Sequence, residues 1–499
     1  MTQDSELRRD FKPHQVFMFS IACAIGTGLV IGSGSALSRG GPGSLLIAYL
    51  LIGTTVFFVM TALGEMATFL PMNKGFGGYA TRMVDPALGF ATGWNYFFKY
   101  IMATPTNLTA AGLVIQYWRP DLNVAIWITI FGVVIVSINV MHVNSFGETE
   151  FWLGLAKILI ITTLIISTFV IAMGGGPNHD RSGFRYWQEP GAFAEYLVGG
   201  PTGKFLGFWA CCTFWRIACF YILGVLVLGM AIPYDNDKLI GATKQATSGA
   251  ASPFVVSVSI AGVKTFPDII NGCLLRGKLR HVTLAYYTGL WLTKNFSATD
   301  IYCSSRSLYG LAKDGQAPRL FAKARENGNP IYAVAFASAF IGLGYMNASK
   351  SSSQVFGYLV SLVTVFAVLN WVAILVTHIA FRRALKAQGI MITDLPYVGV
   401  FQPYGSYFAL AISCLVIIFN GYDAFIPHFK PDVFILRYIG SIIFVVNIAW
   451  WKVAKKTKRN DSASVDLVTD RREFEETETK DDQRWNESIM KNILNKFKR

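Results

Sequence analysis

The chain has 499 residues, of which 53% are hydrophobic and only 15% are charged, and its mean hydropathy is +0.42. Soluble domains carry about 25% charged residues, so this composition excludes an ordinary soluble protein and favours a membrane protein. The net charge of +14 fits basic links between membrane spans, and no RNP, zinc-finger or basic-zipper pattern supports nucleic-acid binding.

Apolar stretches recur along the chain, and one membrane crossing takes ~20 predominantly apolar residues. Two of the stretches, 252–275 and 281–312, are weak because charged or polar residues interrupt them. We therefore predict an all-α membrane protein with about 11–12 transmembrane helices. The candidate spans are 14–37, 44–70, 87–116, 122–142, 151–173, 205–233, 252–275, 281–312, 331–346, 354–380, 403–426 and 432–451.

Basic residues predict which side of the membrane each link faces. They concentrate in the links 71–86, 313–330 and 381–389 and after residue 451. These four regions fall on one side if the chain starts in the cytosol and crosses twelve times. We expect a cytosolic N-terminal tail, a transmembrane transporter domain and a cytosolic C-terminal tail, with bounds 1–13, 14–451 and 452–499.

The C-terminal tail is highly charged, which predicts a solvated segment. Near its end, apolar residues recur at helical spacing among lysines, from Trp485 to Phe497. This pattern is typical of a basic amphipathic helix on a membrane surface, and a disordered tail is the alternative.

A glycine motif, Ile25-Gly26-Thr27-Gly28, lies in the middle of the first apolar stretch. Glycine disfavours helix, and a break at mid-membrane exposes backbone N–H groups that can bind a substrate carboxylate. The same small residues could instead let another helix pack closely. The spacing alone leaves both interpretations open.

Two ionisable residues stand within apolar runs. Lys157 lies seven residues into such a run, where it can extend to the interface or act as a buried, titratable amine that carries a proton. Glu65 lies near the end of the second span, just before Pro71, and we expect it at the membrane interface.

No enzyme motif is present. Gly203-Lys204 lacks the earlier glycine of a phosphate-binding loop, the six histidines form no H-E-x-x-H, and no G-x-S-x-G occurs. The seven cysteines form no C-x-x-C pair. We therefore predict no catalytic residues, no metal site and no cofactor.

Several sequence blocks resemble fungal amino-acid permeases of the amino acid–polyamine–organocation superfamily. They include AIGTGLVIGSGSALSRGGPGSLLIAYLL (24–51), LGEMATFLP (63–71), FGETEFWLGLAKI (146–158) and SSRSLYGLAKDGQAPRLF (304–321). These blocks are spread over most of the chain, and their joint occurrence is specific to that family.

The resemblance implies a LeuT-like helical bundle of two inverted five-helix repeats plus two further helices. It implies proton-coupled uptake of amino acids, with Ile25, Gly26, Thr27 and Gly28 holding the substrate and Lys157 coupling the proton. Asn107 stands where many relatives carry a glutamate, which puts a proton role for that position in doubt.

Two stretches depart from the family pattern. In relatives a sixth helix follows the block GKFLGFWA (203–210) and leads through a basic loop to the seventh helix. Here 203–214 runs directly into 215–234, which resembles the seventh helix, so 205–233 suffices for one crossing and not for two. We predict a sixth helix that is truncated and fused to the seventh. Residues 276–295 have no counterpart and split the eighth helix.

We interpret the chain as an amino-acid permease, and as a proton symporter in which the proton gradient replaces any cofactor. Its partners are amino acids, protons and the lipid bilayer of the plasma membrane, with both termini cytosolic. The alternative is a permease-like membrane protein that does not transport, either a sensor or a defective gene product. The oligomeric state and the amino acid carried stay open.

Overall fold

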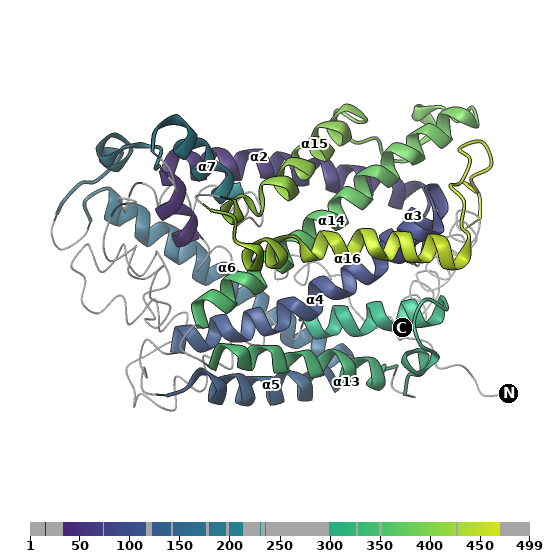
Figure 1. Cartoon of the computed structure of the whole chain (residues 1–499), viewed down its shortest axis with the longest axis horizontal. Helices are drawn as coiled ribbons and strands as arrows, with labels where there is room; N and C mark the ends of the chain where they lie inside the picture. Colours follow the sequence, from purple (N-terminus) through teal and green to yellow (C-terminus); the bar gives the residue numbers. More distant parts are fainter. Residues whose placement is uncertain are drawn as a thin grey trace, which may run out of the picture. The chain divides into compact units, whose positions relative to one another are not determined.

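The structure is a computed structural model. It describes residues 15, 33–72, 74–115, 122–140, 143–175, 179–195, 199–212, 230, 235, 299–325, 328–348, 352–425 and 428–469. Within these ranges all regular secondary structure is helical, as predicted (Figure 1). The glycine motif at 25–28, most of the run 205–233 and the insertion 276–295 lie outside the described residues.

The described α-helices follow the order of the predicted spans. They are α2 (Ser33–Phe69), α3 (Gly75–Met83), α4 (Pro86–Ile115), α5 (Val124–Val140), α6 (Val143–Ala172), α7 (Gly200–Cys212), α13 (Ile331–Ala339), α14 (Ser352–Ala387), α15 (Tyr404–Phe419) and α16 (Pro431–Lys455). Residues 299–313 are also helical. Shorter turns are the π-helix η2 (Trp187–Gly191) and the 3-10 helices η4 (Arg319–Ala322), η5 (Phe340–Ala348), η6 (Ile392–Asp394) and η7 (Tyr422–Ala424).

Four helices in the described part of the chain are long and apolar enough to cross a membrane. They are Ala36–Phe69, Gly357–Ala387, Tyr404–Ala424 and Val433–Lys455. They correspond to the predicted spans 44–70, 354–380, 403–426 and 432–451. On the last of them, large apolar side chains such as Val445, Val446 and Trp450 are exposed, as expected of a helix that faces lipid.

The helix α2 breaks at Gly41, whose backbone has φ 76° and ψ 170° and which is followed by Pro42. The break therefore separates the end of the first predicted span from the second. The backbone N–H of Gly43 donates to the carbonyl of Ala192 at 2.7 Å. A Cβ atom on Gly41 would lie 2.8 Å from the same carbonyl oxygen. Glycine is required here for both its positive φ and this close approach.

The chain forms two compact units. The first comprises Met1–Thr54, Trp94–Asn370 and Ile412–Phe444, and the second comprises Thr55–Gly93, Trp371–Ala411 and Val445–Arg499. In the first unit, α5 packs against α13 and η5. Its apolar core combines side chains of α4, α5, 299–313 and α13, among them Phe97, Phe131, Leu308 and Val334.

The second unit has its own apolar core, to which α2, α3, α14 and α15 contribute. Its buried members include Met66, Tyr79, Phe381 and Ala409. Phe69 and Phe381 bring α2 and α14 together, with ring centroids 5.7 Å apart.

Residues 456–469 follow α16 and fold back onto this core; we call them the C-terminal strap (Figure 1). The side-chain amide of Asn460 donates to the carbonyls of Thr81 and Arg82 at 2.9 and 2.8 Å. Its backbone N–H donates to the carbonyl of Val84 at 2.9 Å. The strap is thereby fixed to the end of α3.

Apolar contacts hold the other half of the strap. Val465 and Leu467 are buried in the core of the second unit. The side-chain amide of Gln388, just after α14, donates to the carbonyl of Val465 at 2.7 Å. The strap departs from the expectation of a solvated tail, because two of its apolar residues are buried in the core of the second unit.

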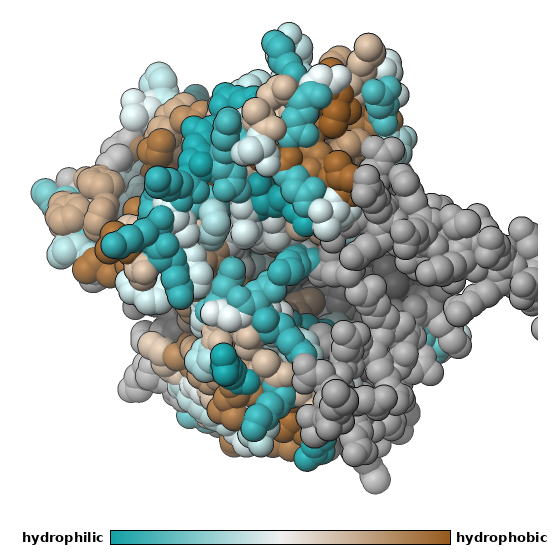
Figure 2. Space-filling model, turned by 90° about the vertical axis from the view of Figure 1, so that its right-hand side faces the viewer, coloured by the Kyte–Doolittle hydropathy of each residue, from teal (hydrophilic) through white to brown (hydrophobic). Residues whose placement is uncertain are grey.

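Exposed basic side chains mark the helix ends of the second unit. They are Lys74 before α3, Arg383 and Lys386 on α14, and Lys452 and Lys455 on α16. The space-filling view in Figure 2 shows hydrophilic residues interspersed with hydrophobic patches on the coloured part of one face. The basic residues belong to the same links on which the predicted orientation rests.

Candidate functional site

Most of the substrate and proton sites predicted from the sequence lies outside the residues that the structure describes. Ile25, Gly26, Thr27 and Gly28 lie outside the described residues. Lys157 lies on α6, but its side chain is also outside them. These assignments stay predictions. The described residues instead contain two buried polar groupings.

The first grouping centres on Glu65, which was expected at the membrane interface. Its side chain has no exposed surface, and it lies in an otherwise strongly apolar helix, α2. A buried carboxylate is costly unless other groups pair with it and donate hydrogen bonds to it.

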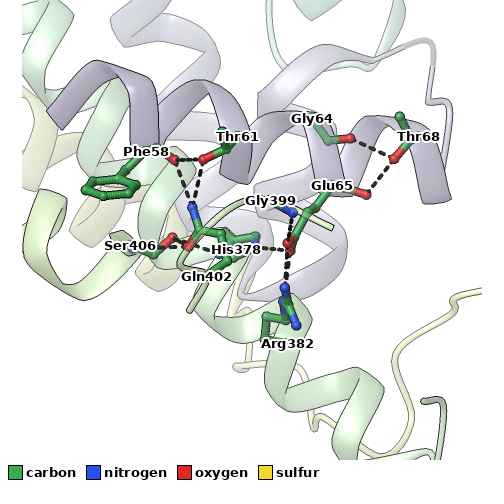
Figure 3. Close-up of polar contacts among 10 residues, drawn as sticks. All are labelled: Phe58, Thr61, Gly64, Glu65, Thr68, His378, Arg382, Gly399, Gln402 and Ser406. Atoms are coloured by element: carbon green, nitrogen blue, oxygen red, sulfur yellow. Dashed lines mark hydrogen bonds and ion pairs between the residues drawn. The ribbon is translucent and has the colours of Figure 1, made fainter. Parts of the chain in front are cut away.

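Four nitrogen atoms contact the Glu65 carboxylate (Figure 3). Nε of Arg382 donates to Oε2 at 2.8 Å, and Nη2 of the same side chain donates to Oε1. Nε2 of His378 lies 2.6 Å from Oε2, and the backbone N–H of Gly399 donates to Oε1 at 2.7 Å. This two-point pairing with arginine and the additional donors indicate an ionised carboxylate.

The network continues from His378 toward the start of α15. Nδ1 of His378 lies 2.9 Å from the Ser406 hydroxyl, which lies 2.6 Å from Oε1 of Gln402. The amide nitrogen of Gln402 donates to the carbonyl of Phe58 and to the hydroxyl of Thr61, both at 3.0 Å.

We call this network the Glu65 cluster. Its members are Thr61, Glu65, His378, Arg382, Gly399, Gln402 and Ser406, and it joins α2, α14, α15 and the link before α15.

Helical spacing brings these side chains together. His378 and Arg382 are four residues apart on α14, as Thr61 and Glu65 are on α2, so each pair lies on one face of its helix. A side chain at Gly399 would meet the Gln402 side chain at 2.9 Å and Thr61 at 3.1 Å. Glycine therefore lets the backbone reach the carboxylate. Polar pairs at this spacing within apolar helices are the sequence signal that could have marked these positions, although it does not show which helices meet.

The second grouping lies in the first unit. The Asn107 amide donates to Oδ2 of Asp300 at 2.7 Å, and both side chains are buried. Asn107 is the position at which many members of the resembled family carry a glutamate. A carboxylate from residues 299–313 therefore lies beside it.

Neither grouping resembles a metal centre. Among the described residues, no group of three His, Cys, Asp or Glu side chains is placed to hold a metal ion. The interactions that the Glu65 cluster offers are hydrogen bonds and the ion pair between Glu65 and Arg382.

Comparison with known proteins gives a single family. The sequence model of the family described as amino acid permease matches residues 15–214 and 210–463. An uncharacterized amino-acid permease of Schizosaccharomyces pombe is 47% identical over 494 residues, covering 92% of this chain and 92% of the relative. The dicarboxylic amino acid permease of Saccharomyces cerevisiae is 41% identical over 526 residues, covering 97% and 84%.

A proline-specific permease of Emericella nidulans is 37% identical over 510 residues, covering 94% of this chain and 89% of the relative. In the alignment with each of the two yeast relatives, the number of aligned positions exceeds the number of residues of this chain that are aligned. Each of these two relatives therefore contains residues that have no counterpart here.

Proposed function

The chain belongs to the amino acid permease family, and we propose that it is built as a proton-coupled carrier that brings amino acids into the cell. The observation that carries this proposal is the family match, which extends from residue 15 to residue 463. The apolar helices of the described part of the chain agree with an integral membrane protein. The test is uptake of labelled amino acids by a host that lacks its own permeases.

The proposed architecture is the LeuT-like bundle of two inverted five-helix repeats. In it, Ile25, Gly26, Thr27 and Gly28 interrupt the first helix, and their backbone N–H groups bind the substrate carboxylate. Lys157 on α6 accepts and releases the coupled proton. The family match supports both assignments because it includes these residues.

The substrate site has its own test. Gly26→Val and Gly28→Val should both abolish binding of labelled substrate while the protein still reaches the membrane, because a β-branched residue resists unwinding and fills the carboxylate site. Retention of both variants inside the cell would instead favour the helix-packing interpretation of the motif.

The names of the relatives suggest which substrates to try first. One relative is named for dicarboxylic amino acids and another for proline. We therefore propose glutamate, aspartate and proline as the first labelled compounds, each supplied alone and then against an excess of the other two.

The transport activity of this chain is proposed to be weak because its sixth helix is truncated. The family match divides into two segments that meet at residues 210–214, inside the run 205–233. Both yeast relatives also contain residues with no counterpart here. These findings support the loss of a broken helix that would line the substrate site. They equally favour the alternative of a permease-like protein that does not transport.

A paired uptake experiment separates these alternatives. One arm uses this chain, and the other uses a version with a sixth helix restored and residues 276–295 removed. Activity only in the restored version would support the truncation. Equal uptake rates in the two versions would contradict the proposal that the truncated sixth helix weakens transport.

The proposed location is the plasma membrane, with both termini in the cytosol. Asn347-Ala348-Ser349 is a glycosylation sequon in a link proposed to face outward, whereas Asn486-Glu487-Ser488 lies in the C-terminal tail. Of these two sequons, only Asn347 should carry sugar. Sugar on Asn486 would overturn the orientation.

A further inference from the structure

Both ring nitrogens of His378 contact a hydrogen-bonding partner, and the side chain has no exposed surface. Nε2 faces a carboxylate oxygen of Glu65, whereas Nδ1 faces the Ser406 hydroxyl. A hydroxyl can either donate or accept, so the partner of Nδ1 does not fix whether that nitrogen carries a proton.

With a neutral ring, every group keeps a partner, but the Ser406 hydroxyl cannot donate to both His378 and Gln402. Nε2–H donates to Glu65 over 2.6 Å, and the Ser406 hydroxyl donates to Nδ1 over 2.9 Å. Oε1 of Gln402 still accepts from the backbone N–H of Ser406 at 3.1 Å, but no proton then lies in its 2.6 Å contact with the Ser406 oxygen.

With a protonated ring, the heavy-atom positions allow every contact of the network to be a hydrogen bond. Nδ1–H donates to the Ser406 oxygen, and the Ser406 hydroxyl turns to donate to Oε1 of Gln402, which is 2.6 Å away. The change from one state to the other needs one proton and the rotation of one hydroxyl. No buried donor or acceptor is left unpaired in either state.

We propose that His378 is a proton-binding site, with Ser406 and Gln402 as the groups that accept hydrogen bonds in series from the protonated ring. Glu65 is the poorer site for that proton. Its two oxygens already accept from Arg382, Gly399 and His378, and protonation would replace an acceptor by a donor.

Charged and polar groups surround His378 on each described element that packs against it. The α2 helix contributes Glu65, α14 contributes Arg382, the link before α15 contributes the Gly399 N–H and Gln402, and α15 contributes Ser406. Glu65 attracts a second cation, whereas Arg382 opposes it. His378 and Arg382 contact the same carboxylate, so a charge on one ring or guanidinium affects the other.

This proton site is separate from the proposed role of Lys157 and does not depend on transport. An ionisable side chain inside a membrane span is commonly functional, and His378 lies within the span Gly357–Ala387. The inference can therefore be tested on the full chain even if that chain carries no amino acid.

The test is infrared difference spectroscopy of the purified full chain in lipid, titrated between about pH 5 and 8 with isotope-labelled histidine. We expect an imidazole band that titrates together with a perturbed carboxylate band. His378→Gln should lose that imidazole band, and Glu65→Gln should lose the carboxylate response. The matched control is His179→Gln, because His179 is exposed and lies outside the cluster.

The proposal is wrong if the spectra of the wild-type chain and of His378→Gln differ by no titrating imidazole band. If His378→Gln does not fold, Ser406→Ala decides, because it retains the imidazole and removes the hydroxyl that serves both states. A titration midpoint that differs from the wild-type value supports the proposal, and an unchanged midpoint contradicts it.

Discussion

Lys452, near the end of α16, forms an ion pair with Asp85, the residue that precedes α4, with Nζ 3.0 Å from Oδ2. The other oxygen of Asp85 accepts from the backbone N–H of Ala87 at 2.8 Å and from the Thr457 hydroxyl at 3.0 Å. Asp85 thus caps the start of α4 and anchors the beginning of the C-terminal strap.

The electrostatics of this anchor predict how the strap responds to acid. Burial would raise the pKa of Asp85, but the hydrogen bonds and Lys452 outweigh it and hold the pKa below its usual value. Hydrogen bonds from Thr469 and Val468 lower the pKa of Asp466 to about 2. Their contribution to stability is therefore complete above about pH 4, near the ordinary aspartate pKa, and is lost as the pH falls through the lower folded values.

Hydrogen exchange followed by mass spectrometry measures this response. The peptide covering 456–469 should stay protected from neutral pH to about pH 4 and lose protection below it. Asp85→Asn should lower the protection already at neutral pH. Loss of protection between pH 7 and 5 in the wild-type chain would contradict the assignment.

The apolar part of the strap predicts a stability effect. Leu467 is buried, so Leu467→Ala should destabilise the second unit by about 2–3 kcal/mol. Val468 is 50% exposed, and Val468→Ala should stay within about 0.5 kcal/mol of the wild type. Denaturant unfolding in detergent compares the two variants. Equal effects would show that the strap does not pack.

The break in α2 predicts a second stability effect. Gly41→Ala would place a Cβ 2.8 Å from the Ala192 carbonyl oxygen on a backbone with positive φ, which should cost about 1–3 kcal/mol. At Gly342 an added Cβ meets no atom within 4 Å, so Gly342→Ala is the control. A clear fall in melting temperature is expected for the first variant only.

Lys157 is tested by the pH dependence of uptake, in this chain or in the version with the sixth helix restored. Lys157→Ala should abolish that dependence, whereas Lys157→Arg should keep the charge but lose titration near neutral pH. Normal transport by both variants between about pH 5 and 8 would show that the lysine only extends to the interface.

The apolar helices were predictable because length and hydropathy are local properties. The span 354–380 was predicted where α14 runs from Ser352 to Ala387, and 432–451 where α16 runs from Pro431 to Lys455. Both helices continue beyond the ends of the predicted spans, because the residues that extend each helix include charged ones, which lower the hydropathy.

The partners of Glu65 were not predictable in this way. His378 is 313 residues away in the sequence, and nothing in the apolar run around Glu65 indicates which helix will face it. The packing of Val465 and Leu467 was missed for a related reason, since the neighbouring lysines and aspartates dominate the composition of the tail.

The strap also sets the order in which this protein can be completed during synthesis. Asn460 binds the carbonyl of Thr81 across 379 residues of chain, and the core that contains Tyr79 also contains Leu467. At about 5–20 residues per second, the ribosome needs roughly 20–80 s to make the intervening chain. The early helices of the second unit must therefore wait, with part of their packing surface uncovered, until the last-made helix and the strap arrive.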